Sequence, residues 1–92
     1  MKYEFFSDPG HGWLKVPLKE IEQLGLADKI SICSYINAGY VYLEEDWDLP
    51  LFLQAKWGDC PIKEAFYRYI VVHHSNNISR IRTYASYNSE IL

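Results

Sequence analysis

Two short segments with helical spacing interrupt a chain that is otherwise rich in β-forming residues. The first covers 17–24, has a proline in its first turn and is followed by Gly25, which suits a left-handed C-cap. The second runs from about residue 49 to 56, again with a proline near its start, and ends at Gly58. A chain of 92 residues has room for one hydrophobic core. Both helices must therefore pack on one small sheet, in a single domain over 1–92.

The expected strands are short. Runs with alternating or β-branched residues lie at 3–6, 13–16, 29–36, 40–44 and 64–72. The clearest hairpin joins the third run to the fourth through the turn residues 37–39. Because Cys33 falls among the isoleucines of the third run, we expect its thiol to be buried. Residues 79–84 alternate polar and apolar side chains, which indicates a last short strand.

The segment after Cys60 fits two structures. Four of its residues have the spacing of a helix face: Ile62, Ala65, Phe66 and Tyr69. Residues 66–72, however, are aromatic and β-branched, as strands often are. We favour the extended strand over 64–72, followed by a polar loop at 73–77.

The order strand, helix, strand, strand, helix, strand predicts an α+β domain. We expect an antiparallel sheet of four to five strands with two helices on one face. A ferredoxin-like arrangement is the natural specific case. Such a fold hosts many functions and by itself predicts no activity.

The charges are divided unevenly along the chain. The net charge is −3, but residues 1–48 carry nine acids against four lysines, whereas residues 49–92 carry three acids against five bases. Internal ion pairs between the two halves explain this better than two oppositely charged faces. The N-terminus has no signal-peptide pattern and no apolar run is long enough to cross a bilayer. We therefore expect no membrane partner and a cytoplasmic protein with reduced Cys33 and Cys60.

The run 8–17 contains the residue that we single out first. His11 stands between Gly10 and Gly12, and Trp13 follows. Glycine permits positive φ and a close approach of the backbone, so the imidazole could be exposed and bind a ligand. The alternative is that His11 braces a turn while Trp13 anchors the loop in the core.

One resemblance covers most of the chain. The motif Asp8-Pro9-Gly10-His11-Gly12-Trp13-Leu14-Lys15-Val16-Pro17-Leu18, together with 24–31, 39–46 and 79–84, resembles a family of short proteins of tailed phages, plasmids and bacteria. That family has no established activity. The resemblance implies an accessory protein of a mobile element, such as one that binds a host factor.

Two charged clusters complete the candidates. In the acidic cluster 44–48, we expect Asp46 or Asp48 to cap the second helix and the Trp47 ring to pack beneath it; a divalent cation or a basic partner is the alternative. Arg80 and Arg82, with Tyr84 nearby, form the basic cluster. The histidines and cysteines lack the spacing of a zinc site, so no metal and no cofactor is expected.

These observations favour a non-enzymatic interaction protein that binds a host protein, as an inhibitor of a host or defence system does. Its expected binding residues are His11, Gly12, Trp13, Arg80, Arg82 and Tyr84. The alternative is a small-molecule or anion-binding domain, with minor hydrolase or transferase activity, in which His11 is a base and Arg80 or Arg82 holds a phosphate. Two arginines are few for nucleic acid, which is not favoured. A homodimer remains open.

Overall fold

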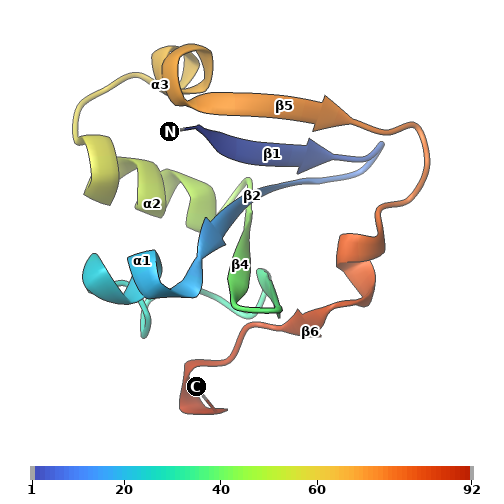
Figure 1. The fold of residues 1–92 in the computed structure, drawn as a ribbon, viewed down its shortest axis with the longest axis horizontal. Helices are drawn as coiled ribbons and strands as arrows, with labels where there is room; N and C mark the ends of the chain where they lie inside the picture. The colour runs from blue at the N-terminus through green and yellow to red at the C-terminus, as the bar shows by residue number, and fades with distance from the viewer. Residues whose placement is uncertain (1, 92) are drawn as a thin grey trace.

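A mixed sheet forms the centre of the fold in the computed structural model, which describes residues 2–91 (Figure 1). In this part of the chain its strands lie in the order β5-β1-β2-β4-β3-β6. Their bounds are β1 (Tyr3–Ser7), β2 (Gly12–Pro17), β3 (Tyr35–Asn37), β4 (Tyr40–Glu44), β5 (Ile70–His74) and β6 (Ala85–Ser86). The helices are α1 (Leu18–Gln23), α2 (Asp48–Trp57) and α3 (Ile62–Tyr69), with 3₁₀ turns η1 (Arg80–Thr83) and η2 (Ser89–Ile91). None of the helices in the described range is long and apolar enough to span a membrane.

The α+β class is confirmed, but the antiparallel sheet of four to five strands is wrong. Six strands take part, and β5 runs parallel to β1 while every other neighbouring pair is antiparallel. Parallel neighbours need a crossover connection. Here α2 and α3 carry the chain back to the start of β1 before β5 begins (Figure 1). The ferredoxin-like arrangement is not confirmed.

The larger hydrophobic core lies between the sheet and the α-helices. Every second residue of β2 and β4 faces it, as the two-residue period of a strand requires. These residues are Leu14, Val16, Val41 and Leu43. The helices contribute Ile21, Phe52 and Ala65, all fully buried. Three helices, rather than the expected two, therefore cover this face.

A smaller cluster occupies the opposite face of the sheet. Trp13 of β2 and Tyr42 of β4 point to this side, and Ile81 of η1 packs on them. Phe6, Tyr35 and Tyr84 surround the three. Trp13 is only 2% exposed, which confirms that it anchors its loop. η1 packs on this face from outside the sheet and covers only part of it. The face therefore stays accessible on both sides of η1.

The expected strand over 64–72 is wrong for its first six residues, which belong to α3. Pro61 accepts the first helical hydrogen bond from the Ala65 backbone N–H, at 2.9 Å. Ala65 is fully buried, and the ring of Phe66 contacts that of Phe5 with centroids 5.2 Å apart. The helical spacing thus prevailed over β propensity because it places these two residues on the core. The chain becomes extended at Ile70, and β5 continues into the segment expected to be a polar loop.

The expected strand over 29–36 is also largely wrong, since only its last two residues join β3. The carboxylate of Asp48 accepts hydrogen bonds from the Ser31 backbone N–H and from the hydroxyls of Ser31 and Ser34. These bonds hold 31–34 in a turn. Cys33 is consequently exposed, and its predicted burial is wrong.

The predicted hairpin and the first helix are confirmed. β3 and β4 are joined by Ala38 and Gly39, whose φ values of +52° and +83° fit the tight turn of a two-residue hairpin. α1 ends before Gly25, which has φ +71°. The left-handed conformation that a C-cap needs is therefore present.

The predicted caps of α2 and the final strand are wrong. No side chain caps α2: Asp48 binds the 31–34 turn instead, and the Trp47 ring is 69% exposed rather than packed beneath the helix. Residues 80–83 form η1 because the Ser79 hydroxyl accepts a hydrogen bond from the Ile81 backbone N–H. The short strand β6 begins only at Ala85.

Candidate functional site

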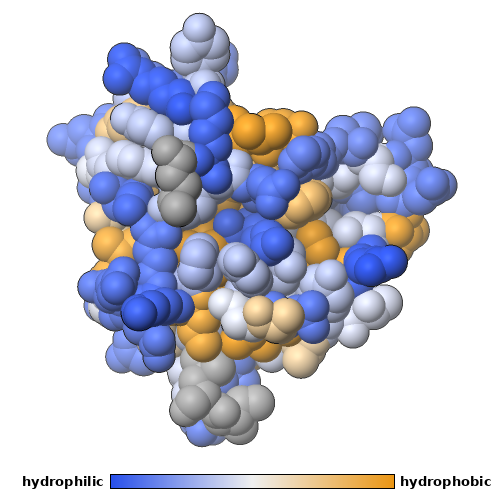
Figure 2. All heavy atoms as spheres, viewed as in Figure 1, coloured by the Kyte–Doolittle hydropathy of each residue, from blue (hydrophilic) through white to orange (hydrophobic). Residues whose placement is uncertain are grey.

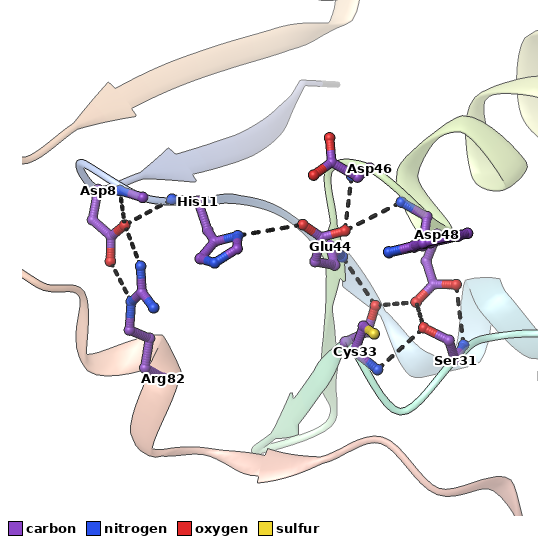
Figure 3. A network of polar contacts seen from close by, with 11 residues as sticks. Asp8, His11, Ser31, Cys33, Glu44, Asp46, Asp48 and Arg82 are labelled. Carbon is purple, nitrogen blue, oxygen red and sulfur yellow. Dashed lines mark hydrogen bonds and ion pairs between the residues drawn. The ribbon is translucent and has the colours of Figure 1, made fainter.

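The buried carboxylate of Asp8 ties the N-terminal loop to the C-terminal segment. Its Oδ1 accepts hydrogen bonds from the backbone N–H groups of Gly10 and His11, at 2.9 and 3.0 Å. Its Oδ2 accepts one from the backbone N–H of Ser79, at 3.0 Å. Arg82 adds a two-pronged ion pair, with Nε 2.7 Å from Oδ2 and Nη2 2.9 Å from Oδ1 (Figure 3). One side chain thus fixes both the loop and η1.

The ion pair between Asp8 and Arg82 changes the pKa values of both groups. The guanidinium, followed by the backbone N–H groups, holds the pKa of Asp8 well below its usual range. The same hydrogen bonds raise the pKa of Arg82. The Arg82 guanidinium also lies over the ring of Trp13, 5.5 Å from its centroid. This ion pair between the two halves of the chain confirms the predicted internal pairing for Arg82.

A cavity of about 290 Å³ opens beside this ion pair at one end of the sheet face. Three of the predicted binding residues line it: His11, Trp13 and Arg82. Five further residues complete the wall: Cys33, Tyr35, Glu44, Asp46 and Trp47. We call this hollow the acidic cavity. His11 is exposed, which is one of the two alternatives left open by the sequence, and its ring points toward Glu44 (Figure 3).

Glu44, at the end of β4, is the most buried carboxylate of the acidic cavity. It is 6% exposed. Its Oε2 accepts hydrogen bonds from the backbone N–H groups of Asp46 and Trp47, at 2.8 and 3.2 Å, which stabilises the turn before α2. Its Oε1 lies 3.6 Å from Nδ1 of His11, beyond hydrogen-bond distance. Glu44 therefore stabilises the turn that precedes α2 and does not cap the helix, as Asp46 or Asp48 was expected to do.

Gly12 is required by packing rather than by positive φ. A Cβ at this position would lie 2.2 Å from Cζ of Phe5. The backbone there approaches a ring of its own chain, not a ligand. Gly12 thus permits a close approach of the backbone, as predicted, but to the Phe5 ring. Gly12 does not line the acidic cavity.

The remaining two predicted residues line a separate hollow of about 260 Å³ on the other side of η1. Arg80 and Tyr84 lie there with Lys15 and Tyr42. We call it the basic groove. The rings of Tyr42 and Tyr84 are 5.1 Å apart, and burial followed by Tyr84 raises the pKa of Tyr42. Among the described residues, no carboxylate lies within ion-pair distance of Arg80 or Lys15. Arg80 therefore does not share a hollow with His11, whereas Arg82, the other arginine that the anion hypothesis names, lines the acidic cavity with His11.

The acidic turn also brings three carboxylates close together. One oxygen each from Glu44, Glu45 and Asp46 lies within 4.8 Å of the others. Exposed acidic groups of this kind are common in proteins without an ion. This arrangement is therefore not sufficient by itself to indicate a metal centre.

Several residues of the acidic cavity were missed as binding residues because the sequence offered each a simpler role. Helix capping explained the acids of the cluster that holds Glu44 and Asp46. The Trp47 ring was expected to pack beneath the helix, and Cys33 resembled a core residue. Tyr35 alternates with the isoleucines of the expected strand. The available signal was Trp47 itself, an aromatic residue among four acids that a solvated turn does not need.

Comparisons of the chain with protein-family models, curated proteins and solved structures found no match.

Proposed function

We propose that this protein is a non-enzymatic interaction module that binds a host protein through the sheet face around η1. The observation that carries the proposal is the acidic cavity with Trp47 on its wall, 69% exposed. An exposed tryptophan beside a concave, partly apolar surface is typical of residues that contribute most to protein binding. The resemblance to proteins of phages, plasmids and bacteria directs the search to a bacterial host.

The arrangement of the reactive side chains supports binding rather than catalysis. Cys33 and His11 line the same cavity, but no hydrogen bond joins them within residues 2–91. A cysteine nucleophile needs a base within hydrogen-bond reach. Arg82, which lines the same cavity, is already paired with Asp8.

Figure 2 shows how polar and apolar residues are distributed over one face of the molecule. Polar residues cover most of this side, and apolar residues show in separate areas between them. A host protein would then be held by a few anchors rather than by a broad apolar interface.

The second candidate function, anion binding, is favoured by the basic groove. Lys15 and Arg80 are the cations that face this hollow. Phosphate binding there would shift the NMR signals of these two side chains while those of His11 stay unchanged.

Affinity capture with two variants, each of which lacks one exposed aromatic ring, tests the proposal. Trp47→Ala removes the exposed ring of the acidic cavity, and Tyr67→Ala removes an 85% exposed ring of α3 as a matched control. We expect a specific bacterial protein to be retained at physiological salt by the wild type and by Tyr67→Ala, and to be lost with Trp47→Ala. The proposal fails if no protein is retained or if both variants retain it equally.

A further inference from the structure

The charges in the wall of the acidic cavity indicate which group a partner presents there, so this inference rests on the proposed function. Glu44 and Asp46 contribute two carboxylates. The cation of the same wall, Arg82, has Nε and Nη2 committed to Asp8. Its charge is therefore balanced outside the cavity, and the cavity itself keeps an excess of negative charge (Figure 3).

One oxygen of the buried Glu44 is poorly satisfied. Oε2 accepts two backbone hydrogen bonds, whereas Oε1 has only the imidazole of His11 at 3.6 Å. Among residues 2–91, no hydrogen-bond donor reaches Oε1. A carboxylate oxygen that lacks a hydrogen-bond partner within the protein favours an incoming donor, and a charged donor most of all.

Glu45, the residue after Glu44, is affected by the same excess of negative charge. Burial, followed by repulsion from Asp46 and Glu44, raises the pKa of Glu45. A positive charge placed among these carboxylates relieves that repulsion. The occupant should therefore be a cation.

The aromatic part of the wall selects a planar cation. Trp13, Tyr35 and Trp47 supply three rings. The guanidinium of Arg82 already lies over Trp13, so this environment accepts such a group. A guanidinium stacks on aromatic rings and bonds a carboxylate with two parallel N–H groups, whereas an ammonium ion is compact and strongly hydrated.

A second observation favours a peptide over a free ion. Within the described residues, Nε1 of Trp13 is the buried side-chain polar atom that lacks a hydrogen-bond partner. An indole N–H is a donor only. Because Trp13 also lines the acidic cavity, an occupant that carries acceptors, as a peptide main chain does and a metal ion does not, is favoured beside this residue.

We propose that the acidic cavity binds an arginine side chain presented by a partner protein. The guanidinium donates to Glu44 and Asp46 and packs against the rings of Trp13 and Trp47. His11 borders the bound group and Arg82 remains paired with Asp8.

An NMR titration of the full chain with acetyl-Gly-Arg-Gly-amide tests this assignment. The indole N–H signals of Trp13 and Trp47 should shift, while that of Trp57, which stacks on Tyr69 in the helix-face core, should not. The same peptide with citrulline keeps the shape of arginine without its charge. We expect it to bind at least about tenfold more weakly, because it cannot form charge-assisted hydrogen bonds.

Three carboxylate variants locate the site. Glu44→Gln should weaken the arginine peptide by about tenfold or more. Because Glu44 also stabilises a turn, Asp46→Asn at an exposed side chain provides a second variant, which should weaken binding about two- to fivefold. Asp28→Asn, at an exposed carboxylate of another turn, is the matched control and should leave binding unchanged.

The inference is overturned if the arginine peptide shifts neither Trp13 nor Trp47, or if the citrulline peptide shifts them equally. Occupation of the carboxylates by Mg²⁺ without a response to arginine also overturns it. A negative titration with capture still sensitive to Trp47→Ala leaves the proposed function standing. A positive titration without any captured partner overturns the proposed function instead.

Discussion

The two sides of η1 differ in how their cations are used. On one side, Arg82 is paired with the buried Asp8, and the acidic cavity beyond it is lined by Glu44 and Asp46. On the other side, Arg80 faces the basic groove with no ion-pair partner among residues 2–91. Two arginines that are two residues apart thus have opposite roles. One holds the fold together, and the other is available to solvent or a ligand.

The difference arises from the geometry of a single 3₁₀ turn. Ile81 is buried against Trp13 and Tyr42, so the residues before and after it project to opposite sides. The side that receives Arg82 already holds a carboxylate with several hydrogen-bond donors. Arg80 and Arg82 are the same residue type, so proximity to Asp8 determines which of them stabilises the fold.

Asp8→Asn should give the largest effect, because it breaks the contact on which both sides depend. The variant keeps the size of the side chain but loses the charge that pairs with Arg82 and holds η1. We expect a clear fall in the melting temperature and a loss of ligand response in both hollows. Thermal and urea unfolding measure it, with the exposed Asp28→Asn as a control that should melt like the wild type.

The pH dependence of this effect has a definite sign. Because the pKa of Asp8 is lowered in the folded protein, its contribution to the free energy of unfolding is complete above the ordinary aspartate pKa of about 4. That contribution is lost as the pH falls below about 4 toward the lowered pKa. The stability difference between wild type and Asp8→Asn should therefore be constant from about pH 5 to 7 and narrow in acid. A difference that widens in acid contradicts the assignment.

Gly12→Ala should have the next largest effect and should act on the acidic side. The new methyl group would lie 2.2 Å from Cζ of Phe5 and 3.1 Å from Oε2 of Glu45. Phe5 is itself buried against Phe66, so the crowding should cost about 1–3 kcal/mol of stability. Urea unfolding measures the loss. Gly10→Ala, whose methyl group meets only the flexible end of Arg82 and the Asp8 carboxylate, should cost less.

The parts of the fold that local chemistry determines were predictable from the sequence. The positive-φ turn at Ala38-Gly39 and the glycine after α1 have conformations that few residues tolerate, so each leaves a clear signal. The strands β1 and β2 were predicted from alternating and β-forming residues, and anchoring of the loop by Trp13 was one of the two alternatives for this segment. Exposure of His11 was one of two alternatives that the sequence left open, whereas internal pairing of charges from the two halves was predicted.

The parts that depend on distant contacts were not predictable. The turn at 31–34 exists because Asp48, 14 residues beyond Ser34, accepts its hydroxyl hydrogen bond. The parallel pairing of β5 with β1 joins residues 70–74 to residues 3–7, which lie far apart in the sequence. Arg82 could not be separated from Arg80 without knowing that Asp8 lies beside it. Periodicity describes one segment at a time and contains none of these partners.

Arg80→Ala should have the smallest effect on the fold, which sharpens the contrast with Arg82→Ala. Arg80 is exposed and lines only the basic groove, so its loss should change the free energy of unfolding by less than about 0.5 kcal/mol. Arg82→Ala leaves Asp8 buried without its partner and should lower the melting temperature distinctly. Paired melting curves of the two variants measure this. The two substitutions remove the same type of side chain from the same 3₁₀ turn, and only Arg82→Ala breaks the ion pair with Asp8. Equal melting temperatures would therefore mean that this ion pair does not hold η1.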